Sequence, residues 1–234
     1  MKIDQKKLYS WAQDLYPIHR SIAGEGVRKT LIYLKKLLPN LELKKIASGK
    51  KVYGWKVPKE WSVKEAYIKN SKGKKIIDLK NNNLHVISHS QPTNKKLNLE
   101  SLKKNLYSLK DQPKAIPYIT SYYSNRWGFC ISYEKLKKLR KDVYHVVIKS
   151  SFKNGYLNYG ELIIPGKSKD EILISTNICH PSMGNNETSG IVVATALANW
   201  VSKLKNRRYT YRIIFIPETI GSIAYIHLNK SKLK

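Results

Sequence analysis

Residues 171–218 read EILISTNICHPSMGNNETSGIVVATALANWVSKLKNRRYTYRIIFIPE, and their pattern decides the fold class. Two runs, Glu171–Thr176 and Tyr211–Ile216, are almost continuously apolar, as in strands that are buried on both faces of a parallel sheet. Between them, Gly190–Leu204 carries apolar residues at helical spacing. A strand, a helix and a strand in this order form a βαβ unit, in which the two strands run parallel. The sequence therefore predicts an α/β fold.

The loops that follow these two strands carry the polar residues of the region. One loop, 177–190, contains His180, and the other, 217–222, contains Glu218. The carboxyl ends of parallel strands meet at one edge of the sheet, where open α/β folds bind ligands. We therefore expect His180 and Glu218 to lie on the same rim, although they are far apart in the sequence.

Two helices and a mostly β segment precede this region. Residues 4–38 predict two helices with one apolar stripe each, and Pro17 ends the first. From about residue 41 to residue 142, short alternating runs separated by Asn- and Gly-rich turns predict a β-rich subdomain. Its aromatic stretch, Tyr118–Phe129, is suited either to core packing or to stacking on sugars or bases.

Two local patterns in and beside this subdomain lead to specific predictions, one for strand pairing and one for a pair of histidines. Lys153-Asn154-Gly155 is a hairpin signal that predicts pairing between strands at Tyr144–Lys149 and Tyr156–Ile164. His85 and His89 fall on an expected strand, where residues four apart are separated by roughly 13 Å, so we expect sheet-surface residues rather than a shared metal.

The composition describes a globular chain with a large positive charge. Its 234 residues carry a formal net charge of +28 at pH 7, which attracts nucleic acid, anionic lipid or anionic saccharide. The lysines occur mostly in scattered pairs, and a nucleic-acid motif is not recognised. An AT-rich coding sequence would also enrich Lys, Asn, Ile and Tyr. We expect no nucleic-acid partner and keep an anionic glycan as a candidate partner.

The cysteines and the apolar runs indicate a cytoplasmic protein without a membrane segment. Cys130 and Cys179 lie far apart without a CxxC spacing, so we expect free thiols in a reducing compartment. The N-terminus has no apolar region typical of a secretory signal. The longest apolar runs, such as Ile213–Ile216, are too short to span a bilayer.

Six segments spread along the chain share a recognisable pattern. They are Pro17–Gly26 (PIHRSIAGEG), Tyr53–Pro58 (YGWKVP), Ser121–Tyr123 (SYY), Trp127–Cys130 (WGFC), Cys179–Met183 (CHPSM) with Thr188–Gly190 (TSG) after Asn-rich residues, and Ile216–Ser222 (IPETIGS). In this order they resemble a bacterial aminopeptidase-like family, related in fold to zinc aminopeptidases and carrying an inserted domain of unknown function. Its members are often described as polysaccharide-biosynthesis proteins. The resemblance implies an incomplete phosphorylase/hydrolase-like α/β core (1–50 and 144–234) with a β-rich insertion at 51–143.

The resemblance also implies a site for one zinc ion. In the family the His of the CHPS segment binds zinc, and this role falls on His180. The next family ligand is an Asp, where this chain has Asn186, whose neutral amide oxygen is a poorer zinc ligand; the adjacent Glu187 is the alternative. Glu218 matches the general base that takes a proton from metal-bound water. Thr219 stands where two-metal relatives have a second Glu ligand, so the pattern implies one ion at most.

The function implied by the resemblance is hydrolysis of an amide or related bond in a small-molecule or peptide-like substrate. Family members continue well beyond the position of Lys234 and add another metal ligand, so we expect a truncated, impaired copy. His227 is expected to be a surface residue rather than that ligand. The sequence leaves open whether the chain is an enzyme and predicts no oligomeric state. The alternative is a non-catalytic protein that binds a glycan or nucleotide sugar through its basic surface.

Overall fold

The computed structural model describes residues 4–233, which form two compact units. The first unit consists of the chain up to Glu60 and from Lys153 onward, and the second consists of Trp61–Phe152. In sequence, the second unit therefore lies inside the first. It begins and ends later than the segment 51–143 that the resemblance implies as the insertion.

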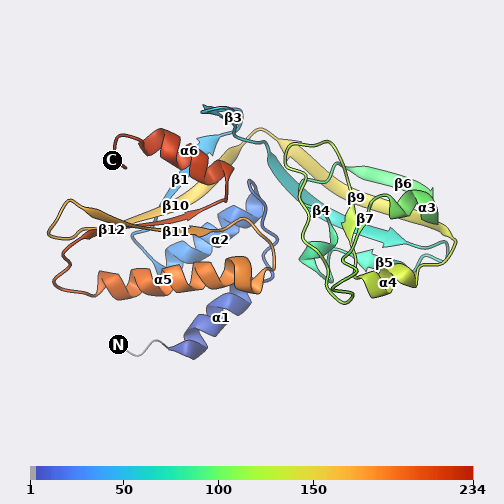
Figure 1. Cartoon of the computed structure of the whole chain (residues 1–234), viewed down its shortest axis with the longest axis horizontal. Coiled ribbons are helices and arrows are strands. Elements are labelled where there is room, and N and C mark those ends of the chain that lie inside the picture. The colour runs from blue at the N-terminus through green and yellow to red at the C-terminus, as the bar shows by residue number, and fades with distance from the viewer. Residues whose placement is uncertain (1–3, 234) are drawn as a thin grey trace. The chain divides into compact units, whose positions relative to one another are not determined.

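A four-stranded sheet forms the centre of the first unit (Figure 1). Its strands, in spatial order, are β1 (Glu42–Ala47), β10 (Tyr156–Ile164), β12 (Thr210–Ile216) and β11 (Glu171–Asn177). β11 and β12 are parallel, whereas β10 is antiparallel to both β12 and β1. The helix α5 (Ser189–Ser202) connects β11 to β12. The predicted βαβ unit and the α/β fold class are confirmed.

Helices cover both faces of this sheet (Figure 1). Those on one face are α1 (Gln5–Leu15), α2 (Glu25–Leu37) and α5, and the one on the other face is α6 (Ile220–Asn229). Successive side chains of β10 point to opposite faces in agreement with this arrangement. Leu162 packs among side chains of α1, α2 and α5, whereas Glu161 accepts a hydrogen bond from Tyr225 of α6. A short hairpin of β2 (Lys51–Val52) and β3 (Trp55–Lys56) belongs to the same unit. Within residues 4–233, no helix is both long enough and apolar enough to cross a membrane.

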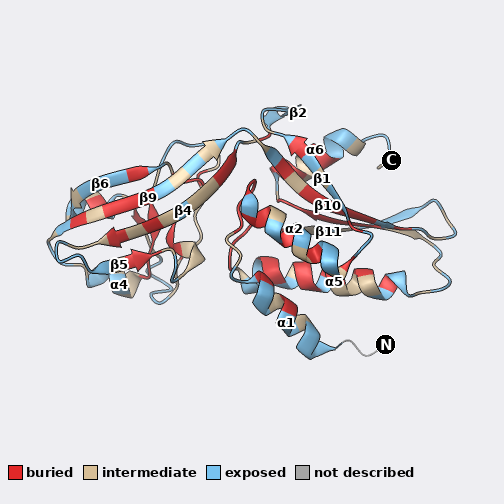
Figure 2. Ribbon diagram, turned by 180° about the vertical axis from the view of Figure 1, so that it is seen from behind, coloured by how far each residue is buried: buried red, intermediate tan, exposed pale blue. Residues whose placement is uncertain are grey.

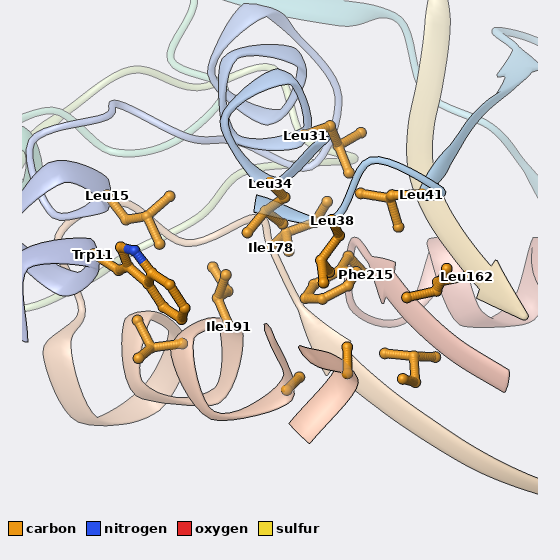
Figure 3. Close-up of a cluster of buried hydrophobic side chains, with 14 of the residues drawn as sticks. Trp11, Leu15, Leu31, Leu34, Leu38, Leu41, Leu162, Ile178, Ile191 and Phe215 are labelled. Carbon is orange, nitrogen blue, oxygen red and sulfur yellow. The ribbon is translucent and has the colours of Figure 1, made fainter. Parts of the chain in front are cut away.

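The core of the first unit lies between its sheet and the helices α1, α2 and α5 (Figure 3). Leu15 of α1 and Leu34 of α2 are fully buried there, next to Phe215 of β12 and Ile191 of α5. The apolar stripes predicted for both N-terminal helices are the sides that they bury. Burying one such side chain contributes about 1.5–3 kcal/mol, so these stripes hold α2 on the sheet and α1 against α5.

The second unit is built on a separate four-stranded sheet with its own core (Figure 2). Its elements are β4 (Glu60–Lys69), β5 (Lys75–Asp78), η1 (Asn83–His85), β6 (Thr93–Asn98), α3 (Leu99–Lys103), β7 (Leu106–Tyr107), β8 (Phe129–Cys130), α4 (Tyr133–Lys137) and β9 (Val143–Lys153). The spatial order in the sheet is β5-β4-β9-β6. Of the aromatic stretch, Phe129 is fully buried in this core, whereas Tyr123 is 58% exposed.

The predicted hairpin around Lys153-Asn154-Gly155 is wrong. The strand before it, β9, pairs with β6 and β4 in the second unit, and the strand after it, β10, pairs with β1 and β12 in the first. Gly155 has another reason to be glycine, because a Cβ there would lie 2.4 Å from the carboxyl carbon of Glu60. The same carboxylate accepts hydrogen bonds from the backbone N–H of Tyr156 (2.9 Å) and from Arg28 (2.6 Å).

The strand expected around His85 and His89 is also wrong. Residues Asn83–His85 form a 3-10 turn, in which the side chain of Asn82 accepts a hydrogen bond from the N–H of Leu84. Both histidines are buried instead of lying on a sheet surface. His85 places Nδ1 2.8 Å from the carbonyl oxygen of Cys130.

Candidate functional site

The structure brings His180 and Glu218 together at the carboxyl edge of the parallel strands. His180 follows β11 and Glu218 follows β12, and their register puts Asn177 opposite Ile216. Nε2 of His180 lies 2.7 Å from Oε1 of Glu218. The expected placement of these two residues on one rim is therefore confirmed, 38 residues apart in the chain.

The other ring nitrogen of His180 also faces acceptors. Nδ1 lies 2.9 Å from Oδ1 of Asn186 and 3.2 Å from Oε2 of Glu187. Burial alone would lower the pKa of His180, but its contacts with Glu187, Asn186 and Glu218 outweigh burial and raise that pKa to about 9. Each ring nitrogen therefore has an acceptor when the imidazole is charged.

Glu187 holds the loop that carries His180. Its side chain is fully buried, and Oε1 accepts hydrogen bonds from the backbone N–H groups of Cys179 and of His180, the latter at 2.9 Å. Among the described residues Oε2 forms no hydrogen bond, apart from its approach to the imidazole of His180. Residues Gly184–Thr188 form a π-helical turn before α5, the kind of widened turn that is often found at functional sites.

Cys179 is the third potential metal ligand at this rim. Its sulfur accepts a hydrogen bond from the backbone N–H of Glu218 at 3.3 Å. The sulfur, a ring nitrogen of His180 and a carboxylate oxygen of Glu218 all lie within 4.8 Å of one another. Burial and the neighbouring carboxylate of Glu187 raise the pKa of the Cys179 thiol well above its usual value. The expectation of a free, buried thiol agrees with this position.

Arg20 fixes the same loop from the N-terminal side. Its fully buried guanidinium donates to the carbonyl oxygens of His180 (2.8 Å) and Leu15 (2.7 Å). Burial lowers the pKa of Arg20, and the carboxylate of Glu187 acts in the opposite direction. In the sequence, Arg20 stands out only as part of the shared segment Pro17–Gly26.

The backbone is strained immediately beside the cluster. Ser182 and Thr219 have φ angles of 46° and 53°, in the left-handed region that is unusual for a β-branched residue such as Thr219. Ser182 is held by its hydroxyl group, which donates to the carbonyl oxygen of Tyr16 at 2.8 Å. Such strain costs about 1–3 kcal/mol per residue and tends to cluster at functional sites.

His227 is not brought to this rim. It lies on α6, where its ring meets the ring of Tyr53 edge to face with centroids 4.9 Å apart. Among residues 4–233, the group of potential ligands at the rim contains Cys179, His180 and Glu218 and does not include His227.

The six shared segments and this geometry agree with the comparison to known protein families. Residues 9–234 match the family described as Domain of unknown function (DUF4910). The chain belongs to this family. The match to DUF4910 thus includes residues of both compact units and the loops that carry His180 and Glu218.

A curated relative of this DUF4910 chain comes from Clostridium acetobutylicum and is described as a polysaccharide biosynthesis protein with aminopeptidase-like domain. It is 48% identical over 228 residues, which are 97% of this chain and 52% of the relative. The chain therefore spans about half the length of the curated relative that it matches.

Solved structures show the same fold. A crystal structure of a protein described as a peptidase from Clostridium acetobutylicum has a TM-score of 0.94 at 47% identity, covering 97% of this chain and 54% of that one. A zinc aminopeptidase from Bacillus subtilis has a TM-score of 0.59 at 14% identity, covering 96% of this chain and 64% of that one. The DUF4910 chain therefore has the fold of a zinc aminopeptidase.

Proposed function

We propose that this chain carries a site for one zinc ion at His180 and that the site is of the aminopeptidase-like hydrolase type. The observation that carries the proposal is the cluster at the carboxyl edge of β11 and β12, in which an imidazole nitrogen, a carboxylate oxygen and a sulfur lie within 4.8 Å. Zinc takes nitrogen and sulfur ligands, so the imidazole of His180 and the sulfur of Cys179 fit this ion in type, and the carboxylate of Glu218 lies beside them.

The contacts of His180 suggest how the roles are divided. Nδ1 already faces Asn186 and Glu187, which leaves Nε2, on the side of Glu218, as the nitrogen for the metal. Asn186 and Glu187, which the resemblance implies as ligands, then orient the imidazole through their contacts with Nδ1. Hydrogen-bond partners of metal-bound histidines commonly have this role. Under this proposal the change from Asp to Asn at position 186 is less damaging than it is for a direct ligand.

Glu218 is the proposed proton acceptor. A third of its side chain is exposed (33%), so it can reach a substrate, and it lies 2.7 Å from the nitrogen proposed for the metal. A carboxylate there can take a proton during attack on a carbonyl group and return it to the leaving amine. Bound zinc would supply a Lewis acid at this place. We infer an amide-type substrate from the fold, and a link to polysaccharide biosynthesis from the description of the relative.

Zinc binding is tested by thermal unfolding with and without zinc. At a zinc concentration 100-fold above its dissociation constant, binding stabilises the folded protein by about 2.7 kcal/mol. This raises the melting temperature by roughly 5–10 °C for a chain of this size. The variant His180→Ala should lose the shift, whereas His227→Ala, a matched histidine of the same unit, should keep it. A shift that survives in His180→Ala, or no shift in the unmodified chain, would contradict the site.

Hydrolysis is tested separately on amino-acid anilides. Turnover should disappear with a chelator and return with zinc. Glu218→Gln should lower the rate by about 10²–10⁴ while it retains the zinc-dependent melting shift, because a general base acts on the reaction and not on metal affinity. A chain that binds zinc without any turnover would refute the hydrolase assignment and leave the metal site intact.

A further inference from the structure

Two loops of the second unit form a densely positive surface, which we call the basic end. One loop is the turn 70–74 between β4 and β5, and the other is 137–142, which leads from the last residue of α4 to β9. α4 lies beside β5 (Figure 1, Figure 2). The basic residues of the two loops are all exposed, and they are Lys72, Lys74, Lys137, Lys138, Arg140 and Lys141.

Asp142 joins the two loops of the basic end. Its carboxylate accepts hydrogen bonds from the backbone N–H of Ser71 in the turn, at 3.3 Å, and from that of Val143 at the start of β9, at 2.7 Å. These hydrogen bonds and the nearby charge of Lys72 lower the pKa of Asp142. The two loops are therefore held side by side, and their basic side chains share one surface.

Apolar residues fix the direction in which the second loop presents its charges. Leu136 and Leu139 pack against the core of the second unit. Lys138 and Arg140, on either side of Leu139, are exposed. The carbonyl oxygen of Arg140 accepts a hydrogen bond from the hydroxyl group of Tyr144 at 2.7 Å. The loop is thus anchored on its inner side, and its cations face the solvent.

Acidic side chains do not neutralise this charge. Asp142 is the acidic residue of the two loops, and its carboxylate already serves backbone N–H groups. Among residues 4–233, no basic side chain of the basic end forms an ion pair, whereas Lys75, directly after the turn, is paired with Asp78 at 2.6 Å. Unpaired like charges at this density create a local field that concentrates anions.

We propose that the basic end binds an anionic polysaccharide and that its lysines pair with carboxylate groups of the polymer. The negative charge of the ligand follows from the surface described above. The choice of a polysaccharide rests on the link to polysaccharide biosynthesis that is inferred under the proposed function. Lysine ammonium groups are compact charges on flexible stems, so they can follow carboxylates that repeat along a polymer without a fixed two-pronged geometry.

Other polyanions fit this surface less well. α4 has five residues, which is too short for a helix that reads a DNA groove. Residues 70–74 and 137–143 include no aromatic side chain, so the bases of a single strand have nothing to stack on. An anionic membrane is typically bound by a basic amphipathic helix with an apolar face. Within these residues the exposed large apolar side chain is that of Val143, which does not form such a face.

The test is binding of a fluorescently labelled oligogalacturonate, a linear polymer with a carboxylate on each sugar, to the 234-residue chain. Fluorescence anisotropy at about 0.15 M salt screens long-range attraction and retains close contacts. The triple variant Lys137→Gln/Lys138→Gln/Lys141→Gln should weaken binding at least ~10-fold, because each cation removed from a polyanion contact lowers the affinity. A neutral dextran of the same length should not bind.

The matched control removes the same charge from the first unit. Lys167→Gln/Lys203→Gln/Lys205→Gln changes exposed lysines there and should alter the affinity less than ~3-fold, because distant exposed charges are screened. Circular dichroism melts of both triple variants should match that of the unmodified chain. Lys72→Gln/Lys74→Gln repeats the test on the other loop and should also weaken binding, so a folding defect in one variant does not decide the result.

Four outcomes would overturn the proposal. They are no binding at this salt concentration, equal weakening by the two triple variants, full affinity in the Lys72→Gln/Lys74→Gln variant, and tighter binding of duplex DNA or of phosphatidylserine vesicles than of oligogalacturonate. His180→Ala should bind the polymer unchanged, and a loss of binding in this variant would place the polymer at the rim and would also contradict the basic end. Binding without turnover would refute the hydrolase assignment alone.

Discussion

Glu187 connects the candidate site to the stability of the fold. Its carboxylate is the acceptor for two consecutive backbone N–H groups, those of Cys179 and His180, in a place without access to water. It also provides a negative charge near the buried guanidinium of Arg20. A residue that was expected as an alternative metal ligand is thus a structural anchor of the loop.

Replacing Glu187 should therefore destabilise the chain. Glu187→Ala leaves two buried N–H groups without an acceptor, each at about 1–3 kcal/mol, so we expect a loss of about 2–6 kcal/mol in urea unfolding. Glu187→Gln keeps one side-chain oxygen for these groups and should lose clearly less. Glu100→Ala, at an exposed position, is the control and should stay within about 0.5 kcal/mol. An alanine variant as stable as this control would show that Glu187 does not anchor the loop.

His89 should make stability depend on pH. It is 1% exposed, lies stacked on Trp61 with ring centroids 5.4 Å apart, and has no hydrogen-bond partner for Nε2 among the described residues. Burial lowers its pKa to about 3. The unfolded chain takes up this proton near pH 6.5 and the folded chain does not, so stability is present above pH 6.5 and is lost as the pH falls toward 3.

The expected slope is about 1.4 kcal/mol per pH unit from this one histidine, measured as the free energy of unfolding between pH 6 and pH 4. His89→Asn should remove that part of the slope, and asparagine tolerates the φ of 65° at this position. Burial also lowers the pKa of His85, so His85 adds a slope of the same sign in both proteins, and the variant should keep a smaller slope than the unmodified chain. Any loss of packing in the variant lowers the free energy of unfolding at pH 7 as well. Equal slopes in the two proteins would therefore contradict the assignment to His89.

At the scale of elements, the start of α2 is locked to the turn before it. A Cβ on Gly26 would lie 2.1 Å from the carbonyl oxygen of His19 and 2.7 Å from Cα of Arg20. Both obstacles are backbone atoms, so a side chain at Gly26 cannot be accommodated unless the turn moves. The turn in question carries the guanidinium that holds the carbonyl of His180.

Gly26→Ala tests this contact because two effects oppose each other. Alanine gains about 1 kcal/mol over glycine in a helix, but overpacking against backbone costs about 1–3 kcal/mol or more. We expect a net loss of about 1–2 kcal/mol in urea unfolding. Gly54→Ala is the control, since a Cβ there meets nothing within 4 Å, and it should be neutral within about 0.5 kcal/mol. A Gly26→Ala variant more stable than the unmodified chain would mean that helix propensity decides.

Elements with a regular apolar pattern could be predicted from the sequence, and their partners only in part. The βαβ unit at 171–216 was predictable because its apolar runs and its crossover allow one arrangement. The turn signal at Lys153-Asn154-Gly155 predicts the wrong partner for the strand before it, because such a signal describes the local backbone and not which strand pairs with which. The 3-10 turn at Asn83–His85 depends on an Asn82 side-chain contact that periodicity does not show.

At the scale of the whole molecule, the site was predictable to the extent that topology defines it. His180 and Glu218 could be placed on one rim because parallel strands end at the same edge. The contribution of Arg20 could not be predicted, because its acceptor, the carbonyl of His180, is 160 residues away in the chain. The net charge of +28 does not place any particular residues together. It therefore does not help to choose between a hydrolase and a glycan-binding protein, or between one anionic partner and another.

Glu60 holds the place where the chain leaves the first unit beside the place where it returns. Its carboxylate accepts a hydrogen bond from the N–H of Tyr156, and Gly155 packs directly against it. Residues 61–152 therefore form an insertion whose two ends leave the first unit side by side. The entropic cost of bringing the two ends of such an insertion together rises by only about 0.6 kcal/mol for each doubling of its length. The cost of closing the chain therefore sets almost no limit on the size of the module between these two positions, whose ends are both held by residues of the first unit.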